Sequence, residues 1–286
     1  MVKKRKLWAF DIGIYIFLTI ALLMCLIPML YVVTVSITPY EEVLKHGGFI
    51  IFTTKFDFSA YVKMFNETGI GRAYGVTTFV TVIGTALNMV LTILVAYPIS
   101  RDNLPGKKAF TMYILFTMLF NGGMIPTYLI VKQFKLVDTI WALIIPQACY
   151  PYNVFLMRTF FKELPNEILE AAEIDGAGET YQLMYVALPL SKPMLMTNLL
   201  FYAVIRWNTY MSCILYETKP AMKTLQVVLR EIIIGSESAL EQAEYTSPTQ
   251  SLKMAAVVLT ALPITIIYPF IQKYFTSGIM VGAVKG

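Results

Sequence analysis

Residues 12–37 read IGIYIFLTIALLMCLIPMLYVVTVSI, a run without a single charged side chain. A helix that crosses the hydrocarbon core of a bilayer needs about 20 predominantly apolar residues, so this run is long enough to span a membrane. It is too long for the apolar part of a secretory signal peptide, and no small-residue cleavage pattern follows it. We therefore expect a retained first transmembrane helix.

The composition of the whole chain agrees with a membrane protein. Of its 286 residues, 57% are apolar and only 14% are charged, and the mean hydropathy is +0.64. Soluble domains are about 45–50% apolar and about 25% charged. A core of this size cannot bury the excess apolar surface, so lipid must cover it. The apolar runs are long and do not alternate in polarity, which favours helices over a β-barrel.

Six such runs predict an all-α integral membrane protein that forms a single transmembrane domain over residues 1–286. The predicted spans cover residues 12–37, 73–100, 109–131, 137–160, 183–216 and 252–271. The fifth run is longer than a bilayer requires, so part of it is expected to project beyond the lipid. Prolines within or near these runs are compatible with spanning helices, because neighbouring groups re-satisfy the freed carbonyls.

The basic residues predict the orientation. The sequence KKRK at positions 3–6 directly precedes the first span, and basic residues there favour a cytoplasmic N-terminus. Six spans then place the C-terminus in the cytoplasm as well. Segments 39–72 and 217–251 become the long outer loops, and segment 161–182 becomes an inner loop between spans four and five.

This inner loop contains the most distinctive polar sequence of the chain, ELPNEILEAAEIDGAG at positions 163–178. An early proline, acidic residues in the first turn and a closing glycine predict a short helix over residues 165–175. Ile168, Ala171, Ala172 and Asp175 fall on one side of that helix. A soluble motor protein could grip such a helix beneath a transporter, whereas the simpler alternative is an ordinary amphipathic helix at the membrane surface.

The motif within this loop resembles one found in the membrane subunits of binding-protein-dependent ABC importers. Its elements are Glu170-Ala171-Ala172, Gly176, Val186 and Leu188-Pro189, with valine in place of the commoner isoleucine. The resemblance implies the type I ABC importer permease fold in a bacterial cell membrane. It also implies that residues 161–182 form a coupling loop that docks on a cytoplasmic ATPase, with Asp175 among the contacting residues.

A second resemblance narrows the expected substrate. The C-terminal residues 272–286 and the segment FYAVIRWN at 201–208 are similar to sugar permeases of the maltose-transporter type. In that group the tail reaches between the two ATPases, which assigns an ATPase-contacting role to Gly282, Ala283 and Lys285. The resemblance implies a carbohydrate substrate, which is expected to be an oligosaccharide.

Arg206 is the charged residue that the sequence places well inside a span. Charges at such depth usually face the bundle interior or a water-filled pathway. One hypothesis is that Arg206 lies on the solute pathway and binds the carboxylate of an acidic sugar through two parallel hydrogen bonds. The structural alternative, which we favour over specificity for acidic sugars, is that Arg206 snorkels outward or pairs with Glu217 or Glu231. The other candidate pathway residues are polar or aromatic: Trp207, Asn208, Tyr210, Asn88 and Asn121.

Two other classes of membrane protein fit the sequence poorly. An ion-coupled secondary transporter, the main alternative, usually carries intramembrane acids or a repeated half-structure, whereas every acid here fits a loop or a span edge. A membrane enzyme would need a cluster of catalytic or metal-binding side chains, and the three cysteines and one histidine are isolated in the sequence.

The energy source is expected to lie in another chain, because no Walker A pattern occurs in this sequence. We therefore predict a non-catalytic subunit that binds no cofactor itself, with ATP and Mg²⁺ on a partner. The resemblance implies a heterodimer with a second homologous permease, two copies of a P-loop ATPase, and an extracellular sugar-binding protein. No nucleic-acid partner is expected.

Overall fold

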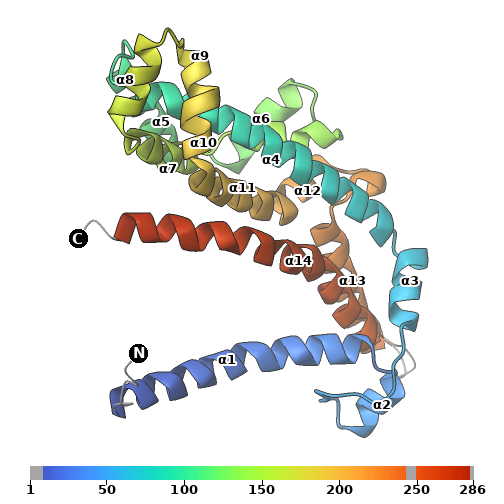
Figure 1. Ribbon diagram of the computed structural model, residues 1–286. Helices are drawn as coiled ribbons and strands as arrows, with labels where there is room; N and C mark the ends of the chain where they lie inside the picture. The colour runs from blue at the N-terminus through green and yellow to red at the C-terminus, as the bar shows by residue number, and fades with distance from the viewer. Residues whose placement is uncertain (1–8, 243–248, 284–286) are drawn as a thin grey trace. The chain divides into compact units, whose positions relative to one another are not determined.

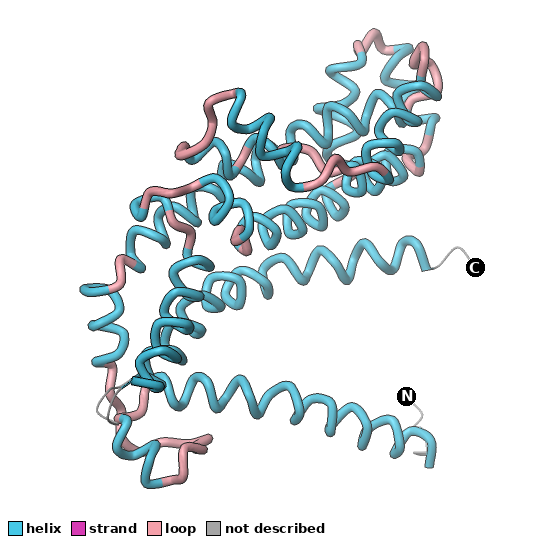
Figure 2. Tube along the Cα trace, turned by 180° about the vertical axis from the view of Figure 1, so that it is seen from behind, coloured by secondary structure: helices cyan, strands magenta, loops and turns pink. Residues whose placement is uncertain are grey.

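The computed structural model describes residues 9–242 and 249–283, and all regular secondary structure in these ranges is helical (Figure 2). The elements in chain order are α1 (Ala9–Ser36), α2 (Tyr40–Lys45), α3 (Ser59–Glu67), α4 (Ile70–Ser100), α5 (Lys107–Leu119), α6 (Met124–Gln133), η1 (Ile140–Leu143), η2 (Ile145–Gln147), α7 (Pro151–Lys162), α8 (Asn166–Ile174), α9 (Glu179–Tyr181), η3 (Gln182–Ala187), α10 (Leu188–Leu190), α11 (Lys192–Trp207), α12 (Met211–Tyr216), η4 (Pro220–Met222), α13 (Leu225–Gln242) and α14 (Thr249–Ala283) (Figure 1).

Three of these helices are each long and apolar enough to cross a membrane. The qualifying segments are Phe10–Ser36 in α1, Ile70–Ser100 in α4 and Gln250–Pro269 in α14. They correspond to predicted spans one, two and six. Prolines lie inside all three helices without ending them, as expected where neighbouring groups take over the freed backbone carbonyls.

Predicted spans three, four and five are each broken into two helical pieces. Lys107–Leu119 and Met124–Gln133 meet at 113°, Ile140–Gln147 and Pro151–Lys162 at 50°, and Glu179–Leu190 and Lys192–Trp207 at 84°. The first break contains Gly123 with a positive φ of 89°, which a residue with a Cβ adopts only with strain. With each bent pair counted as one span, the described residues give up to six candidate spans.

One predicted boundary needs correction. The helix of span five ends at Trp207, and Met211–Tyr216 form the separate helix α12. The segment 217–251, expected as an outer loop, contains the helix α13, which is 18 residues long. An amphipathic helix of this length lacks the continuous apolar run by which spans were recognised in the sequence.

The described residues form two compact units. Unit 1 comprises those within Met1–Ile70 and Val228–Leu262, and unit 2 those within Gly71–Val227 and Pro263–Gly286. In unit 1 the end of α1 packs against the following loop and α14, with Val35, Val43 and Ile50 buried beside Tyr31 and Met254. This apolar cluster anchors the segment that follows the first span.

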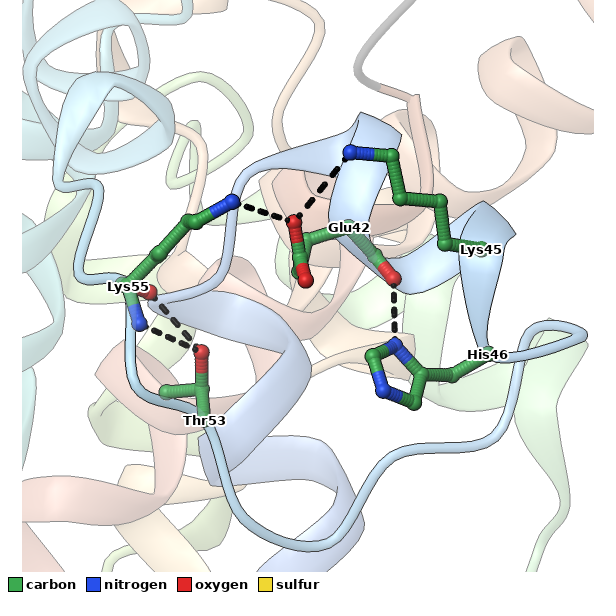
Figure 3. A network of polar contacts seen from close by, with 5 residues as sticks. All are labelled: Glu42, Lys45, His46, Thr53 and Lys55. Carbon is green, nitrogen blue, oxygen red and sulfur yellow. Dashed lines mark hydrogen bonds and ion pairs between the residues drawn. The ribbon is translucent and has the colours of Figure 1, made fainter.

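The segment after α1 is further held by a network of ionic and polar contacts (Figure 3). The Glu42 carboxylate lies 2.9 Å from Lys55 Nζ and 3.6 Å from Lys45 Nζ. The hydrogen bond from Lys55 is the largest cause that holds the pKa of Glu42 below its ordinary value. His46 Nδ1 lies 2.9 Å from the carbonyl oxygen of Glu42, and Thr53 Oγ1 donates to the carbonyl of Lys55. The network is exposed, so salt weakens it.

The main core of unit 2 lies where α4, α7 and η3 meet. Its buried residues are Ala96, Tyr97, Ile99, Val154, Met157, Phe161, Leu183 and Ala187. Tyr97 and Phe161 meet edge to face with ring centroids 5.6 Å apart, a favoured aromatic geometry. Because η3 directly follows the predicted coupling loop, this core fixes the base of that loop.

Candidate functional site

The predicted coupling loop contains a short helix with a well-defined end. Helix α8 runs over Asn166–Ile174, with Pro165 before it and Asp175 after it, as the sequence predicted to within one residue at each end. Gly176 is left-handed, with φ of 83°; its N–H bonds to the carbonyl of Glu173 and that of Ala177 to the carbonyl of Ala172. These two bonds form a Schellman motif, which satisfies the last carbonyls and turns the chain sharply away.

One side of α8 anchors it and the other is open. Leu169 is buried, with 3% of its surface exposed, whereas Ile168 is 42% exposed and Ile174 is 87% exposed. Ala171 is exposed and lies three residues from each isoleucine, so the three form a continuous apolar stripe, which we call the α8 stripe. Ala172 is half-buried at its edge. The sequence predicted this face but not Ile174, because the predicted face continued to Asp175, the residue directly after Ile174.

Side chains that the sequence analysis did not select tie this loop to the C-terminal end of α4, which is predicted to face the cytoplasm. Gln182 is buried, donates to the carbonyl of Ala177 at 2.9 Å and accepts from Arg101 Nη2 at 3.4 Å. Arg101 also lies 3.8 Å from the Glu179 carboxylate and 6.0 Å from the centre of the Tyr97 ring. A displacement of the α8 loop would therefore pull on α4 as well as on span five.

The second half of the motif continues directly into span five. Residues Gln182–Ala187 form a π-helical turn, and Leu188-Pro189 follows it in α10. Leu188 packs on the unit 2 core, whereas Pro189 is exposed. Wide turns of this kind often occur at functional sites. The structure thus brings the motif residues into one continuous path from α8 to α11.

Arg206 occupies a fully buried position in unit 2, with none of its surface exposed. Its Nε donates to Asn88 Oδ1 at 2.8 Å and its Nη1 to the carbonyl of Leu143 at 2.7 Å. Its Nη2 donates to the carbonyls of Ile144 at 3.0 Å and Gln147 at 2.6 Å. The guanidinium has five N–H donors in all, so these bonds engage four of them.

The four bonds join three predicted spans at one point. Asn88 comes from α4 and Arg206 from α11, while the carbonyls belong to the broken part of span four. Short 3-10 turns leave carbonyls without helical partners, and a buried carbonyl without a donor is costly. Arg206 supplies those donors. Asn88 Nδ2 adds a bond to the carbonyl of Gln147 at 2.8 Å.

Close packing at Gly84 makes room for this arginine. A Cβ added at Gly84 would lie 2.9 Å from Arg206 Nε and 3.0 Å from its Cδ, closer than side chains normally approach. Gly84 is buried on α4, one helical turn before Asn88. Sequence reasoning did not identify it, because a glycine inside an apolar run carries no signal of what lies opposite.

The structure corrects three details proposed for Arg206 from the sequence. Arg206 does not lie well inside the helix of span five, because that helix ends one residue later, at Trp207. It neither snorkels to a surface nor forms an ion pair with Glu217 or Glu231 among the described residues. Two free donors for a solute carboxylate are not available either, since four of the five are engaged. A place for Arg206 beside the solute pathway remains a prediction.

The other candidate pathway residues divide into buried and exposed ones. Trp207 is buried and meets the Tyr74 ring edge on at 5.9 Å. Asn208 is exposed and bonds to Gln226 Nε2 at 3.2 Å, while Tyr210 is half-buried against the cluster around Val80. Asn121 is also exposed, and its Oδ1 accepts from the Gly123 N–H. Tyr210 thus packs on the cluster that includes Leu143 and Ile144, whose carbonyls accept from Arg206, and the roles of all these candidates stay predictions.

Beyond span five, a carboxyl group is buried without hydrogen bonds. Glu217 is 6% exposed, and neither of its carboxyl oxygens has a hydrogen-bond partner among the described residues. Burial raises its pKa to about 7; the nearby Asp138 charge adds to the rise and Lys219 opposes it. Asp138 itself accepts from the Thr218 N–H at 2.6 Å and from its hydroxyl, and these bonds lower the pKa of Asp138.

Of the predicted ATPase-contacting tail, Lys285 lies outside the described residues. Gly282 and Ala283 belong to the last turn of α14, where only the backbone is described. In the part of the chain that the structure describes, no group of three or more His, Cys, Asp or Glu side chains is placed to hold a metal ion.

Comparison with known proteins identifies the family. Residues 109–281 match the model of the binding-protein-dependent transport system inner membrane component family. The polygalacturonan/rhamnogalacturonan transport system permease protein YtcP of Bacillus subtilis (strain 168) is 42% identical over 97% of this chain and 98% of its own length. The protein LplC of the same organism is 40% identical over 97% of this chain and 95% of its own.

A solved structure agrees with this assignment. A chain of a bacterial ABC transporter involved in the import of the acidic polysaccharide alginate superposes with a TM-score of 0.85 at 31% identity, covering 96% of this chain and 99% of that one. The predicted ABC permease fold is therefore confirmed, and the ion-coupled alternative is set aside. The chain belongs to the family of inner membrane components of binding-protein-dependent transport systems, and it is a permease subunit of an ABC importer.

Proposed function

We propose that this chain forms half of the translocation pathway for an oligosaccharide that an extracellular binding protein delivers. The full-length relatives support a carbohydrate, since one is a permease for polygalacturonan or rhamnogalacturonan and the matched structure belongs to an importer of alginate. A second, homologous permease forms the other half. Both termini and the α8 loop lie in the cytoplasm, as the basic residues before span one suggest.

The α8 stripe is the observation that carries the coupling part of this proposal. Ile168, Ala171 and Ile174 form an exposed apolar surface on a helix whose opposite residue, Leu169, is buried in the same subunit. Exposed apolar surface rimmed by acidic residues is typical of a protein contact. The partner is one of two cytoplasmic ATPases, which bind ATP and Mg²⁺, and this chain supplies no catalytic group.

Motion would pass from this contact to the membrane along bonded elements. The Schellman turn at Gly176 fixes the exit of α8, and Gln182 joins that exit to Arg101 at the end of α4. The π-helical turn then leads into span five. ATP binding would move α8 and open one side of the pathway, and hydrolysis would reset it. This chain thus acts as a passive gate.

Isolation of the tagged chain from its native cells in mild detergent tests the assembly. We expect recovery of a second multi-span permease and a P-loop ATPase. The variant Ala171→Trp should insert and fold, because the side chain is exposed, yet lose the ATPase and saccharide uptake. Ala171→Ser, which keeps the stripe flat, serves as the matched control. Normal uptake by a well-expressed Ala171→Trp variant would contradict docking through the α8 stripe.

A further inference from the structure

The bonding around Arg206 leaves its positive charge uncompensated. Its four acceptors are the Asn88 amide oxygen and three backbone carbonyls, all of them neutral. No ion pair joins Arg206 to an acidic side chain in the described part of the chain. The bonds therefore stabilise the guanidinium without neutralising it, and a full charge remains buried in the last turn of α11, at the end of span five.

The side chains immediately beyond these acceptors are neutral as well. Gln147 Nε2 donates to Ser212 Oγ at 3.1 Å, and Tyr150 donates to Gln147 Oε1 at 3.0 Å. All three side chains are half-buried, so this polar shell extends from the buried guanidinium toward the outside of the subunit. Nothing in the shell cancels the charge of Arg206.

Holding the broken span together does not by itself require a charge. The neutral amide of Asn88 also donates to the backbone carbonyl of Gln147, so an uncharged donor can satisfy a carbonyl of the broken span. A charged group buried without a counter-ion in a low-dielectric interior is costly, so its retention in the subunit favours a function for the charge itself. The residue on α4 next to the arginine side chain is Gly84, where a Cβ would collide with Arg206. Charges in such surroundings act over distances well beyond a hydrogen bond.

We propose that Arg206 determines substrate specificity by favouring anionic saccharides through its buried, uncompensated charge, without touching them. This inference rests on the proposed function as an oligosaccharide permease and adds the charge class of the solute. The hydrogen bonds of Arg206 hold the break in span four, while its charge lowers the energy of a carboxylate on the pathway. The two roles involve different properties of one side chain, so they are separable by substitution.

The test compares uptake of trigalacturonate and of its fully methyl-esterified form, which has the same skeleton without charge. Complete importers carrying wild-type chain, Arg206→Lys or Arg206→Gln are isolated and reconstituted with the same binding protein, whose own preference cancels between variants. Arg206→Lys keeps the charge but loses the planar fork of donors, whereas Arg206→Gln loses the charge. Thermal stability of each complex is recorded as a measure of folding.

We expect Arg206→Gln to lower the ratio of acid to ester uptake about tenfold, the effect of one charge roughly 10 Å away at an effective dielectric constant of about 20. Arg206→Lys should leave the ratio within about twofold of wild type, even if both rates fall. Where the wild type takes up the acid alone, Arg206→Lys should exceed Arg206→Gln in acid uptake by about the same factor.

Equal losses of both probes in both variants would overturn the inference and leave a purely structural arginine. Uptake of the ester in preference to the acid by the wild type would overturn it as well. Uptake of neither these probes nor neutral oligosaccharides by an intact, ATP-hydrolysing complex would instead contradict the proposed carbohydrate substrate. Failure of the inference and failure of the proposed function are thus distinguishable.

Discussion

Gly84→Ala should destabilise the permease, because the new methyl group would collide with the arginine that joins three spans. The added Cβ would lie 2.9 Å from Arg206 Nε and 3.0 Å from its Cδ. Carbon contacts are favourable at about 3.5–4.0 Å, so the arginine must shift by roughly half an ångström or more. That shift stretches the 2.8 Å bond from Nε to Asn88.

The magnitude follows from two costs and one gain. Overpacking of a filled interior costs about 1–3 kcal/mol, and loss of a hydrogen bond that involves a charged group costs about 1.5–3 kcal/mol. Alanine is better than glycine in a helix interior by about 1 kcal/mol. The net loss is therefore about 1.5–5 kcal/mol. For chains of this size we expect a fall of several degrees in the unfolding midpoint, at about 2–4 °C per kcal/mol.

Gly75→Ala on the same helix provides the control. Nothing lies within 4 Å of a Cβ added at Gly75, so this variant should gain the helix preference without a collision. The midpoints of both variants are measured in detergent at one heating rate, since membrane protein unfolding is commonly irreversible. In an Arg206→Ala background the cost of Gly84→Ala should vanish, because the three atoms nearest to a Cβ at Gly84 all belong to Arg206. Equal midpoints for Gly84→Ala and Gly75→Ala would refute this reasoning.

Two further predictions concern the ends of the molecule's helices. Gly176→Ala should lower ATP hydrolysis stimulated by the binding protein, because a side chain at φ of 83° costs about 1–2 kcal/mol and distorts the turn after α8; Gly178→Ala, at φ of −66°, should not. Equal activity of the two variants would argue against a fixed turn. Burial raises the pKa of Glu217 to about 7, so the folded state holds a proton more tightly than the unfolded chain. Stability from this group is therefore present below about pH 4.5, the ordinary value, and is lost as the pH rises through about 7. Between pH 5 and 8 the thermal midpoint should fall less in Glu217→Gln than in wild type. Glu41→Gln, at an exposed site, is the control and should follow wild type. Parallel curves of midpoint against pH for all three proteins would show that Glu217 is ionised throughout.

The apolar runs and the loop motif were sufficient to predict the fold class and the position of α8. Hydropathy depends on composition over about 20 residues, so it locates a span whether or not the helix is continuous. The breaks near Gly123 and Pro151 depend on how neighbouring segments pack, and prolines within α1 and α4 end no helix. Hydropathy therefore predicts the number of apolar runs more reliably than their geometry.

The surroundings of Arg206 were beyond prediction for a different reason. Three of its four acceptors are backbone carbonyls, which every residue possesses and no residue type reveals. Asn88 was selected as a polar residue within a span, but its pairing with an arginine 118 positions away had no local signal. Acidic side chains were the expected partners because residue type identifies them in a sequence. Residue type does not reveal which backbone carbonyls lose their helical partners at a break.

The position of Arg206 in the chain also has a consequence for biogenesis. Its acceptors on span four are synthesised up to 63 residues before it and Asn88 earlier still, so they leave the ribosome first. Until span five follows, the carbonyls around Gln147 must find other donors, such as water or the insertion machinery, because hydrocarbon offers none. A ribosome stalled between Gln147 and Arg206 would thus leave an unfinished fourth span in the membrane, exposed to quality-control proteases. Completion of span four accordingly waits for a side chain of span five, synthesised 59 to 63 residues after the carbonyls that it bonds.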